Sequence, residues 1–214
     1  MNSRFGDEYF STGWYSDYLN NFKELGKFEA KRLVKVLKPK KTWKFLDVGC
    51  GMGGLVLALR KMGYKAFGTE ISEFCLKNSP AKKWIIKADV SSLPFKKESF
   101  EVVTCFDVLE YLERKKIKKA LDELKRVTKI FLLLEIIPKF SPNSFQKYNP
   151  DPLRKRNLLT YGELIRSMEK RNFIALGRIF NIKEEIDPDC LFLKRKRTNL
   201  KILLSLWKEA KYSA

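Results

Sequence analysis

A glycine loop that follows an apolar run carries the residues best suited to chemistry. Residues 45–48 have the pattern of a buried strand, and residues 49–54 give the spacing glycine-x-glycine-x-x-glycine. That spacing is typical of a tight turn at a helix N-terminus, where the backbone closely approaches a dinucleotide pyrophosphate. Asp47 stands just before the first glycine, where a carboxylate would repel a pyrophosphate but attract the ammonium of a methionine-like ligand. The loop therefore predicts a site for a cationic nucleoside without phosphate, such as S-adenosylmethionine.

Two further acidic residues close apolar runs in the order that such a ligand needs. Residues 65–71 indicate a second strand that ends in Glu70. A carboxylate placed there can accept both ribose hydroxyls, as the acid about 20 residues after the glycines does in dinucleotide folds. Residues 84–90 form a third run that closes on Asp89, which could accept from the adenine amino group. Glu70 fits either kind of cofactor, so the choice between them depends on Asp47.

With a fourth run, residues 100–112, the motifs resemble the class I S-adenosylmethionine-dependent methyltransferases. The signature of that family is D-V-G-C-G-x-G after a strand, an acid ending the second strand, A-D-x-x-x-L-P-F, and D-V-L-E-x-L. The resemblance covers residues 43–128 and continues more loosely to Lys196. It implies S-adenosylmethionine as cofactor and S-adenosylhomocysteine as product. The implied contacts are Asp47, Gly49 and Gly51 at the methionine moiety, Glu70 at the ribose, Asp89 at the adenine and Phe106 at the methionine tail, with Cys50, Ile71 and Val90 beside them.

The chain departs from the family pattern at one position, because many relatives have histidine where this chain has Tyr111. Methyl transfer from a sulfonium needs little covalent help, since holding an acceptor in line with the methyl carbon can suffice. An acceptor that must lose a proton also needs a base, and without histidine this would be a carboxylate, tyrosine or lysine. Tyr111 and Glu110 lie at the right strand end, although Glu110 also suits a helix start. The sequence assigns no catalytic residue and indicates no metal site.

The order of the elements predicts an α/β fold with a doubly wound, mostly parallel sheet. Ser72 is a plausible N-cap for a short helix, and Thr160 begins a capping box. Residues 130–137 are almost wholly apolar, as expected for a central strand covered on both faces. Two strand-like runs follow, at residues 174–182 and 190–196. By resemblance, the sheet has seven strands in the order 3-2-1-4-5-7-6, with the last strand antiparallel.

The chain of 214 residues suits one domain with additions at both ends. We expect a helical N-terminal cover over residues 1–41, a cofactor domain over residues 42–197, and a basic amphipathic helix over residues 198–214. That helix could pack on the domain or a partner subunit, lie on a membrane surface, or contact phosphates. The loop at residues 138–158 should flank the cofactor crevice. Four aromatic residues are candidates for a lid: Tyr9, Phe10, Trp14 and Tyr15.

The composition predicts an anionic partner for the outer surface. The chain has 44 Lys and Arg residues against 25 Asp and Glu residues, a formal net charge of +19. Such an excess suggests contact with nucleic acid or an anionic membrane surface, although a solvated lysine-rich surface would look the same. There is no apolar run of about 18 residues and no secretion-signal pattern, so we expect a cytoplasmic protein. The four widely spaced cysteines predict free thiols.

The favoured function is that of a methyltransferase for a small-molecule or lipid-like acceptor. A nucleic-acid (RNA or DNA) methyltransferase that docks through its basic surface is one alternative, and a non-catalytic scaffold that binds S-adenosylmethionine is another. Enzymes that methylate adenine amino groups carry an Asn/Asp-Pro-Pro-aromatic motif after strand four, where this chain has D-V-L-E at residues 107–110. The identity of the acceptor and the oligomeric state stay open.

Overall fold

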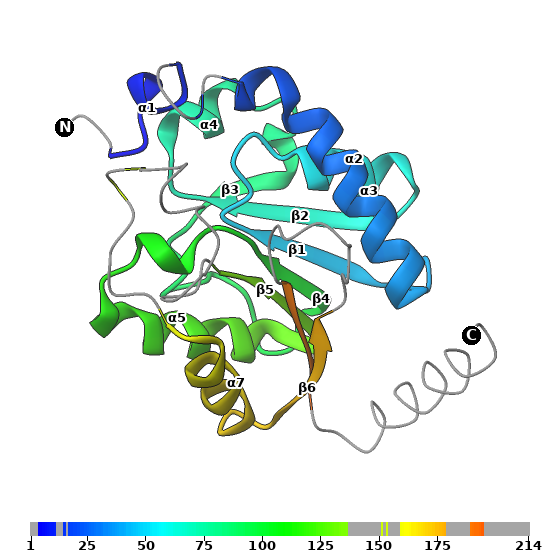
Figure 1. Ribbon diagram of the computed structural model, residues 1–214. Coiled ribbons are helices and arrows are strands. Elements are labelled where there is room, and N and C mark those ends of the chain that lie inside the picture. The colour runs from blue at the N-terminus through cyan, green and yellow to red at the C-terminus, as the bar shows by residue number, and fades with distance from the viewer. Residues whose placement is uncertain are drawn as a thin grey trace.

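Five parallel strands form the main part of the sheet, in the order β3-β2-β1-β4-β5 (Figure 1). The computed structural model describes residues 4–11, 15, 17–136, 151, 153, 159–178 and 189–194. β7 pairs antiparallel with β5 and with the outermost strand, β6. The predicted α/β class and the order of the five parallel strands are confirmed. The strands are β1 (Lys44–Val48), β2 (Lys65–Glu70), β3 (Ile85–Lys87), β4 (Phe100–Cys105), β5 (Thr128–Glu135), β6 (Phe173–Arg178) and β7 (Asp189–Lys194).

Helices cover both faces of the sheet, with α2 and α3 on one face and α5 and α7 on the other (Figure 1). The helices are α1 (Asp7–Ser11), α2 (Tyr18–Leu37), α3 (Gly54–Lys61), α4 (Glu73–Asn78), α5 (Arg114–Val127) and α7 (Tyr161–Glu169), with short 3-10 turns η2 (Lys82–Trp84) and η3 (Leu109–Tyr111). In the part of the chain that the structure describes, no helix is both long and apolar enough to cross a membrane.

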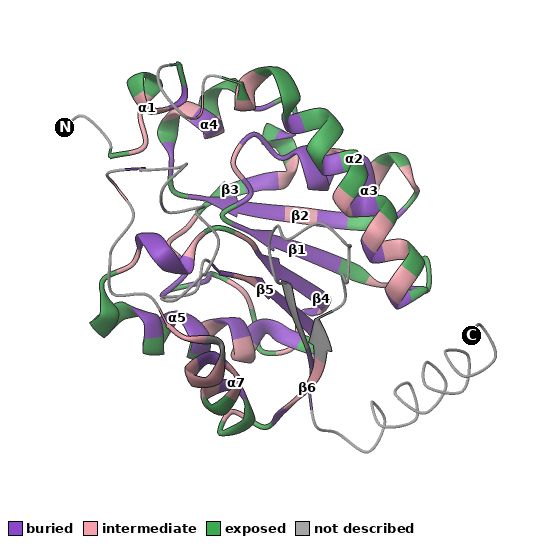
Figure 2. Ribbon diagram, in the orientation of Figure 1, coloured by how far each residue is buried: buried purple, intermediate pink, exposed green. Residues whose placement is uncertain are grey.

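Alternation along the strands sorts the core into two layers. In β1, Leu46 packs in the layer that contains Leu121 of α5, whereas Phe45 packs in the layer that contains Leu33 of α2 and Val56 of α3. All five of these side chains are buried. Successive strand residues point to opposite faces, so a strand covered on both sides must be apolar throughout. Figure 2 shows this burial as a continuous band along the central strands.

Capping residues set the helix boundaries where the sequence predicts them. The Ser72 side chain accepts a hydrogen bond from the Cys75 N–H at 3.2 Å and begins α4. Thr160 and Glu163 form the predicted capping box at the start of α7. The N-terminal cover contains α1 and α2, and α2 ends at Lys38, whose φ of 43° turns the chain toward Pro39. The predicted helix at residues 198–214 lies outside the described residues.

The third strand is shorter than the apolar run at residues 84–90 suggests. Trp84 belongs to the 3-10 turn η2, and the strand pairing of β3 covers only Ile85–Lys87. The chain then turns, because a carboxylate oxygen of Asp89 accepts hydrogen bonds from the N–H and the hydroxyl of Ser91. Asp89 therefore lies in a turn beyond the strand end, not in the strand.

Candidate active site

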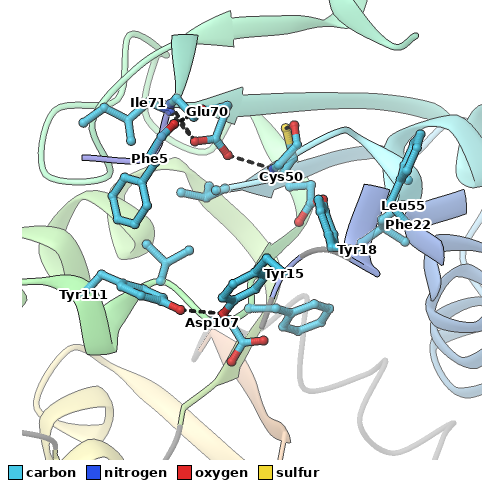
Figure 3. Close-up of a pocket in the computed structure, with 18 of the residues that line it drawn as sticks. Phe5, Tyr15, Tyr18, Phe22, Cys50, Leu55, Glu70, Ile71, Asp107 and Tyr111 are labelled. Carbon is cyan, nitrogen blue, oxygen red and sulfur yellow. Dashed lines mark hydrogen bonds between the residues drawn. The ribbon is translucent and has the colours of Figure 1, made fainter. Parts of the chain in front are cut away.

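A cavity of about 1180 Å³ opens at the carboxyl ends of the parallel strands. The strand order reverses between β1 and β4, which is where open α/β sheets bind their ligands. α1 and α2 also contribute residues to its lining, and Tyr18 of α2 lies beside the glycine loop (Figure 3). Every residue that the sequence predicts for the cofactor lines this cavity: Asp47, Gly49, Cys50, Gly51, Glu70, Ile71, Asp89, Val90 and Phe106. The structure thus gathers residues from the ends of four strands, β1 to β4, and their role in binding stays a prediction.

Asp47 is a buried carboxylate at the end of β1. Its side chain is 8% exposed, and Oδ1 accepts a hydrogen bond of 2.8 Å from the hydroxyl of Thr104 on β4. Burial raises the pKa of Asp47 to about 7; the Thr104 hydrogen bond opposes this, and the nearby charge of Glu70 adds to it. A cation bound in the cavity would stabilise the ionised form of Asp47, which is the electrostatic role that the sequence predicts for it.

The glycine loop brings backbone N–H groups to the cavity wall. Gly49, Gly51 and Gly53 have positive φ values of 75°, 52° and 74°. The N–H groups of Gly49 and Cys50 both donate to the carbonyl oxygen of Thr69, at 2.8 and 3.0 Å, which fixes the loop against β2. A Cβ atom on Gly51 would lie 2.2 Å from the hydroxyl oxygen of Tyr18, so this position accepts only glycine.

Glu70 ends β2 and ties the loop to the following helix. Its Oε2 accepts from the Gly51 N–H at 2.7 Å, and its Oε1 accepts from the N–H groups of Ile71 and Ser72 at 2.7 and 2.8 Å (Figure 3). A carboxylate offers about four acceptor positions. Among the described residues, Glu70 therefore retains a position on Oε2 for one ribose hydroxyl, whereas accepting both hydroxyls requires a backbone N–H to give way.

Asp89 completes the row of acids at the third strand. Partial burial raises its pKa, but the two hydrogen bonds from Ser91 and the charges of Lys116 and Lys119 outweigh that effect and lower the pKa of Asp89 overall. The carboxylate therefore stays ionised and able to accept a hydrogen bond at neutral pH. Val90 beside it is buried, and Ile71 is 46% exposed.

Tyr18 is a site residue that the motifs do not reveal. It lies at the start of α2, far from the glycine loop in the sequence, and its hydroxyl oxygen accepts a hydrogen bond of 2.9 Å from the Met52 N–H. Burial raises the pKa of Tyr18, so the phenol stays neutral. The aromatic composition of the N-terminal segment was the only sequence signal for this contact.

Three tyrosines of the cavity lining form a cluster with an aspartate that lies behind them. The hydroxyls of Tyr9 and Tyr111 each donate to Oδ2 of Asp151 at 2.8 Å, and the hydroxyl of Tyr15 lies 2.7 Å from that of Tyr111 (Figure 3 shows the last pair). Phe5 packs edge-on against Tyr9 and Tyr111. We call Tyr9, Tyr15, Tyr111 and Asp151 the phenol cluster. It joins the N-terminal cover, the loop after β4 and the segment at residue 151.

Only some of the residues predicted as candidates for catalysis or for a lid line the cavity. Tyr111 lines the cavity, whereas Glu110 is 1% exposed and is not among the described lining residues. Of the four candidate lid residues, Tyr9, Phe10 and Tyr15 line the cavity, and Trp14 lies outside the described residues.

Comparison with known proteins agrees with this geometry. The methyltransferase domain family matches residues 46–130. An uncharacterized protein of Methanocaldococcus jannaschii is 34% identical over 116 residues, which are 54% of this chain and 49% of that protein. A sterol 4-C-methyltransferase of Caenorhabditis elegans is 25% identical over 158 residues, which are 63% of this chain and 46% of that protein. This chain thus spans about half the length of these relatives.

A solved structure has the same fold. Magnesium protoporphyrin IX methyltransferase of Synechocystis, with bound S-adenosylhomocysteine, superposes with a TM-score of 0.65 and 16% identity over 86% of this chain and 89% of that protein. Residues 46–130 therefore match the methyltransferase domain family, and the resemblance seen in the sequence is confirmed over this segment.

Proposed function

We propose that this protein transfers the methyl group of S-adenosylmethionine to a small-molecule or lipid-like acceptor. One observation supports this most strongly. Asp47, Glu70 and Asp89 stand at or just beyond the carboxyl ends of β1, β2 and β3, and all three line one cavity. Their carboxylates suit the ammonium, the ribose and the adenine of the cofactor in that order.

The buried acid favours S-adenosylmethionine over a dinucleotide. A pyrophosphate would bring negative charge to the glycine loop, beside Asp47, which is only 8% exposed. Charges interact more strongly in a buried setting than in water. Asp47 therefore repels a phosphate, and attracts an ammonium, more strongly than an exposed carboxylate would. The same acid that weakens dinucleotide binding strengthens binding of the cationic cofactor.

The acceptor side of the cavity is aromatic. Phe5, Phe10 and Tyr15 come from the N-terminal cover and face the loop after β4, which carries Phe106 and Tyr111. Such a wall excludes water and can hold an acceptor in line with the methyl carbon. Two of the three similar proteins named above are a sterol methyltransferase and a magnesium protoporphyrin methyltransferase, which also supports a small-molecule or lipid-like acceptor.

The positive charge of the chain supports a separate proposal about its outer surface. The net charge of +19 favours contact with nucleic acid or an anionic membrane surface, which would bring the enzyme to its acceptor. Binding of a polynucleotide or of anionic vesicles should then weaken steeply as salt increases. Binding that does not depend on salt, or no binding at all, would indicate that the basic residues only form a solvated surface.

Calorimetric titration with S-adenosylmethionine, followed by transfer of its labelled methyl group into lipid, metabolite and RNA fractions, tests the main proposal. We expect binding by the unchanged protein and at least ~10-fold weaker binding by Asp47→Ala and Glu70→Ala, because each loses a charged partner. Asp122→Ala, an exposed acid on α5, is the matched control and should bind normally. Binding without transfer into any fraction would favour the scaffold alternative.

A further inference from the structure

The cavity is acidic although the protein is strongly basic. Among the described residues that line it, acidic side chains far outnumber basic ones, which are only Arg4 and Lys116. Asp107 and Glu113 line the cavity from the segment between β4 and α5, which also carries Tyr111. Arg4 donates to the carbonyl oxygens of Tyr111 and Leu153. A cleft lined by one sign of charge concentrates ligands of the opposite sign, so this cavity attracts cations and repels carboxylates and phosphates.

The hydrogens of the phenol cluster have a single consistent order. Each phenol has one hydrogen to donate. Tyr111 gives its hydrogen to Oδ2 of Asp151 at 2.8 Å, and Tyr9 gives its hydrogen to the same oxygen at 2.8 Å, with the Tyr111 oxygen as a more distant second acceptor at 3.2 Å. The hydrogen in the 2.7 Å contact between Tyr15 and Tyr111 must then come from Tyr15. All three hydrogens therefore lead toward Asp151, which is 7% exposed and is not among the described residues that line the cavity.

This order of the hydrogens determines which methyl acceptors can bind against the phenol cluster. A phenolic oxygen that has already donated its hydrogen interacts with further groups only as an acceptor. The three phenols of the cluster thus offer hydrogen-bond acceptors to a ligand and no donor. A carboxylate or phosphate needs donors and would meet unfavourable partners, whereas an ammonium is a donor only. Aromatic faces from Phe5 and Tyr15 add favourable contacts for a cation.

We propose, on the basis of the function proposed above, that the acceptor is an amine and that the phenol cluster removes its proton. The ammonium gives a proton to the oxygen of Tyr15 while the Tyr15 hydrogen passes to Tyr111 and the Tyr111 hydrogen passes to Asp151. The amine lone pair then forms the new bond to the methyl carbon, and the carbon–sulfur bond breaks with its electron pair remaining on sulfur. The products are a protonated N-methylamine, S-adenosylhomocysteine and a protonated Asp151, which later releases its proton to solvent.

Tyr15 is the catalytic residue in this scheme, because it alone contacts the acceptor, whereas Tyr111 and the final proton acceptor Asp151 act through it. Loss of a proton acceptor typically costs about 10²–10⁴-fold in rate. Asp151→Asn retains the shape of the side chain but cannot take up a proton. We therefore expect ~100-fold slower methyl transfer by this variant with unchanged affinity for S-adenosylhomocysteine. Asp151→Glu should recover part of the rate, which a purely structural role would not predict.

The experiment uses tritiated S-adenosylmethionine with a cell extract of lipids and metabolites, and it classifies the labelled product. Label in alkali-stable amines supports the proposal. Tritiated methanol released by mild alkali would identify a methyl ester, and alkali-stable label in neutral ethers or carbon-methylated products would identify another acceptor; either overturns it. Asp122→Asn and Tyr64→Phe, at positions outside the cavity lining, serve as matched controls.

Two further results separate this inference from the proposed function. If the unchanged protein labels an amine and Asp151→Asn does so equally fast, the proton path is wrong and the methyltransferase function stands. If the unchanged protein binds S-adenosylmethionine but labels nothing in the extract, the proposed function fails and the inference fails with it.

Discussion

The hydroxyl of Thr104 on β4 donates a hydrogen bond of 2.8 Å to Oδ1 of Asp47 on the neighbouring strand β1. The two residues are directly paired in the parallel register of these strands. This bond partly opposes the burial that raises the pKa of Asp47 to about 7. The charge of Asp47 therefore changes near physiological pH, and it does so at the position where the cofactor ammonium is expected.

Cofactor affinity should depend on pH through Asp47. Below its pKa of about 7 the side chain is neutral and no longer attracts a cation, so binding must displace a proton. We expect affinity for S-adenosylmethionine to be constant above that pH and to fall by up to ~10-fold per pH unit below it. Calorimetry over a pH series measures this directly, and equal affinity from about pH 5.5 to about pH 8 would contradict it.

Thr104→Val should shift the same pH dependence upward. The substitution removes the hydrogen bond that lowers the pKa of Asp47, so the pKa should rise further. Cofactor affinity at pH 7 should fall, and the midpoint of its pH dependence should move to higher pH. A midpoint that stays in place in this variant would show that Asp47 does not control the binding.

Asp47→Asn should stabilise the protein without ligand. The pKa of Asp47 is about 7 in the folded state and about 3.9 in an unfolded chain, so the folded protein binds more protons between these values. Its stability therefore falls as pH rises from about 4 to about 7. The variant lacks this penalty, so its thermal midpoint should exceed that of the unchanged protein at about pH 8, and the two should converge near pH 4. A lower midpoint at pH 8 would contradict this.

Gly26→Ala should destabilise the contact between α2 and α3. A Cβ atom on Gly26 would lie 2.1 Å from the backbone carbonyl carbon of Gly54. Overpacking typically costs about 1–3 kcal/mol, which exceeds the gain of up to about 1 kcal/mol from better helix propensity. Gly162→Ala in α7 is the control, because its Cβ would meet only the mobile end of Arg166 at 3.2 Å. Urea unfolding measures the loss of stability in each variant. Equal unfolding midpoints for Gly26→Ala and Gly162→Ala would argue against the close contact between α2 and α3.

Tyr18→Phe should weaken cofactor binding through the glycine loop. The substitution removes the acceptor of the Met52 N–H hydrogen bond, and an unsatisfied buried donor costs about 1–3 kcal/mol. We expect several-fold weaker binding of S-adenosylhomocysteine by Tyr18→Phe, while Tyr64→Phe, which removes the hydroxyl from a ring packed against Phe45, should bind normally. Identical affinities for the two variants would show that the loop holds its shape without Tyr18.

The sequence predicted the sheet and the cofactor crevice because their signals are local. Asp47, Glu70 and Asp89 each follow an apolar run, and parallel strands bring their carboxyl ends to the same edge. The prediction of β3 was too long, because apolar content cannot separate the turn at Trp84 from the strand that follows it. The side-chain turn at Asp89 likewise appears only once its bonds to Ser91 are known.

The sequence named Tyr9 and Tyr111 as separate candidates, but the hydrogen bonds that join them to Asp151 were not predictable, because they link segments that are distant in the sequence. Tyr9 and Tyr111 are 102 residues apart, and Asp151 is a further 40 residues along the chain. Each of these residues has an ordinary local context, and nothing in its neighbours signals the other two. The same is true of the close approach of Gly26 and Gly54, which depends on how two helices cross. Long-range packing of this kind leaves no periodic pattern.

The most direct test is a crystal structure of the protein with S-adenosylmethionine. We expect the adenosyl group in the cavity, with its ribose at Glu70, its adenine at Asp89 and the ammonium of its methionine moiety near Asp47. An empty cavity, or a cofactor whose ammonium lies away from Asp47, would contradict the central claim that acids at successive strand ends bind this cation.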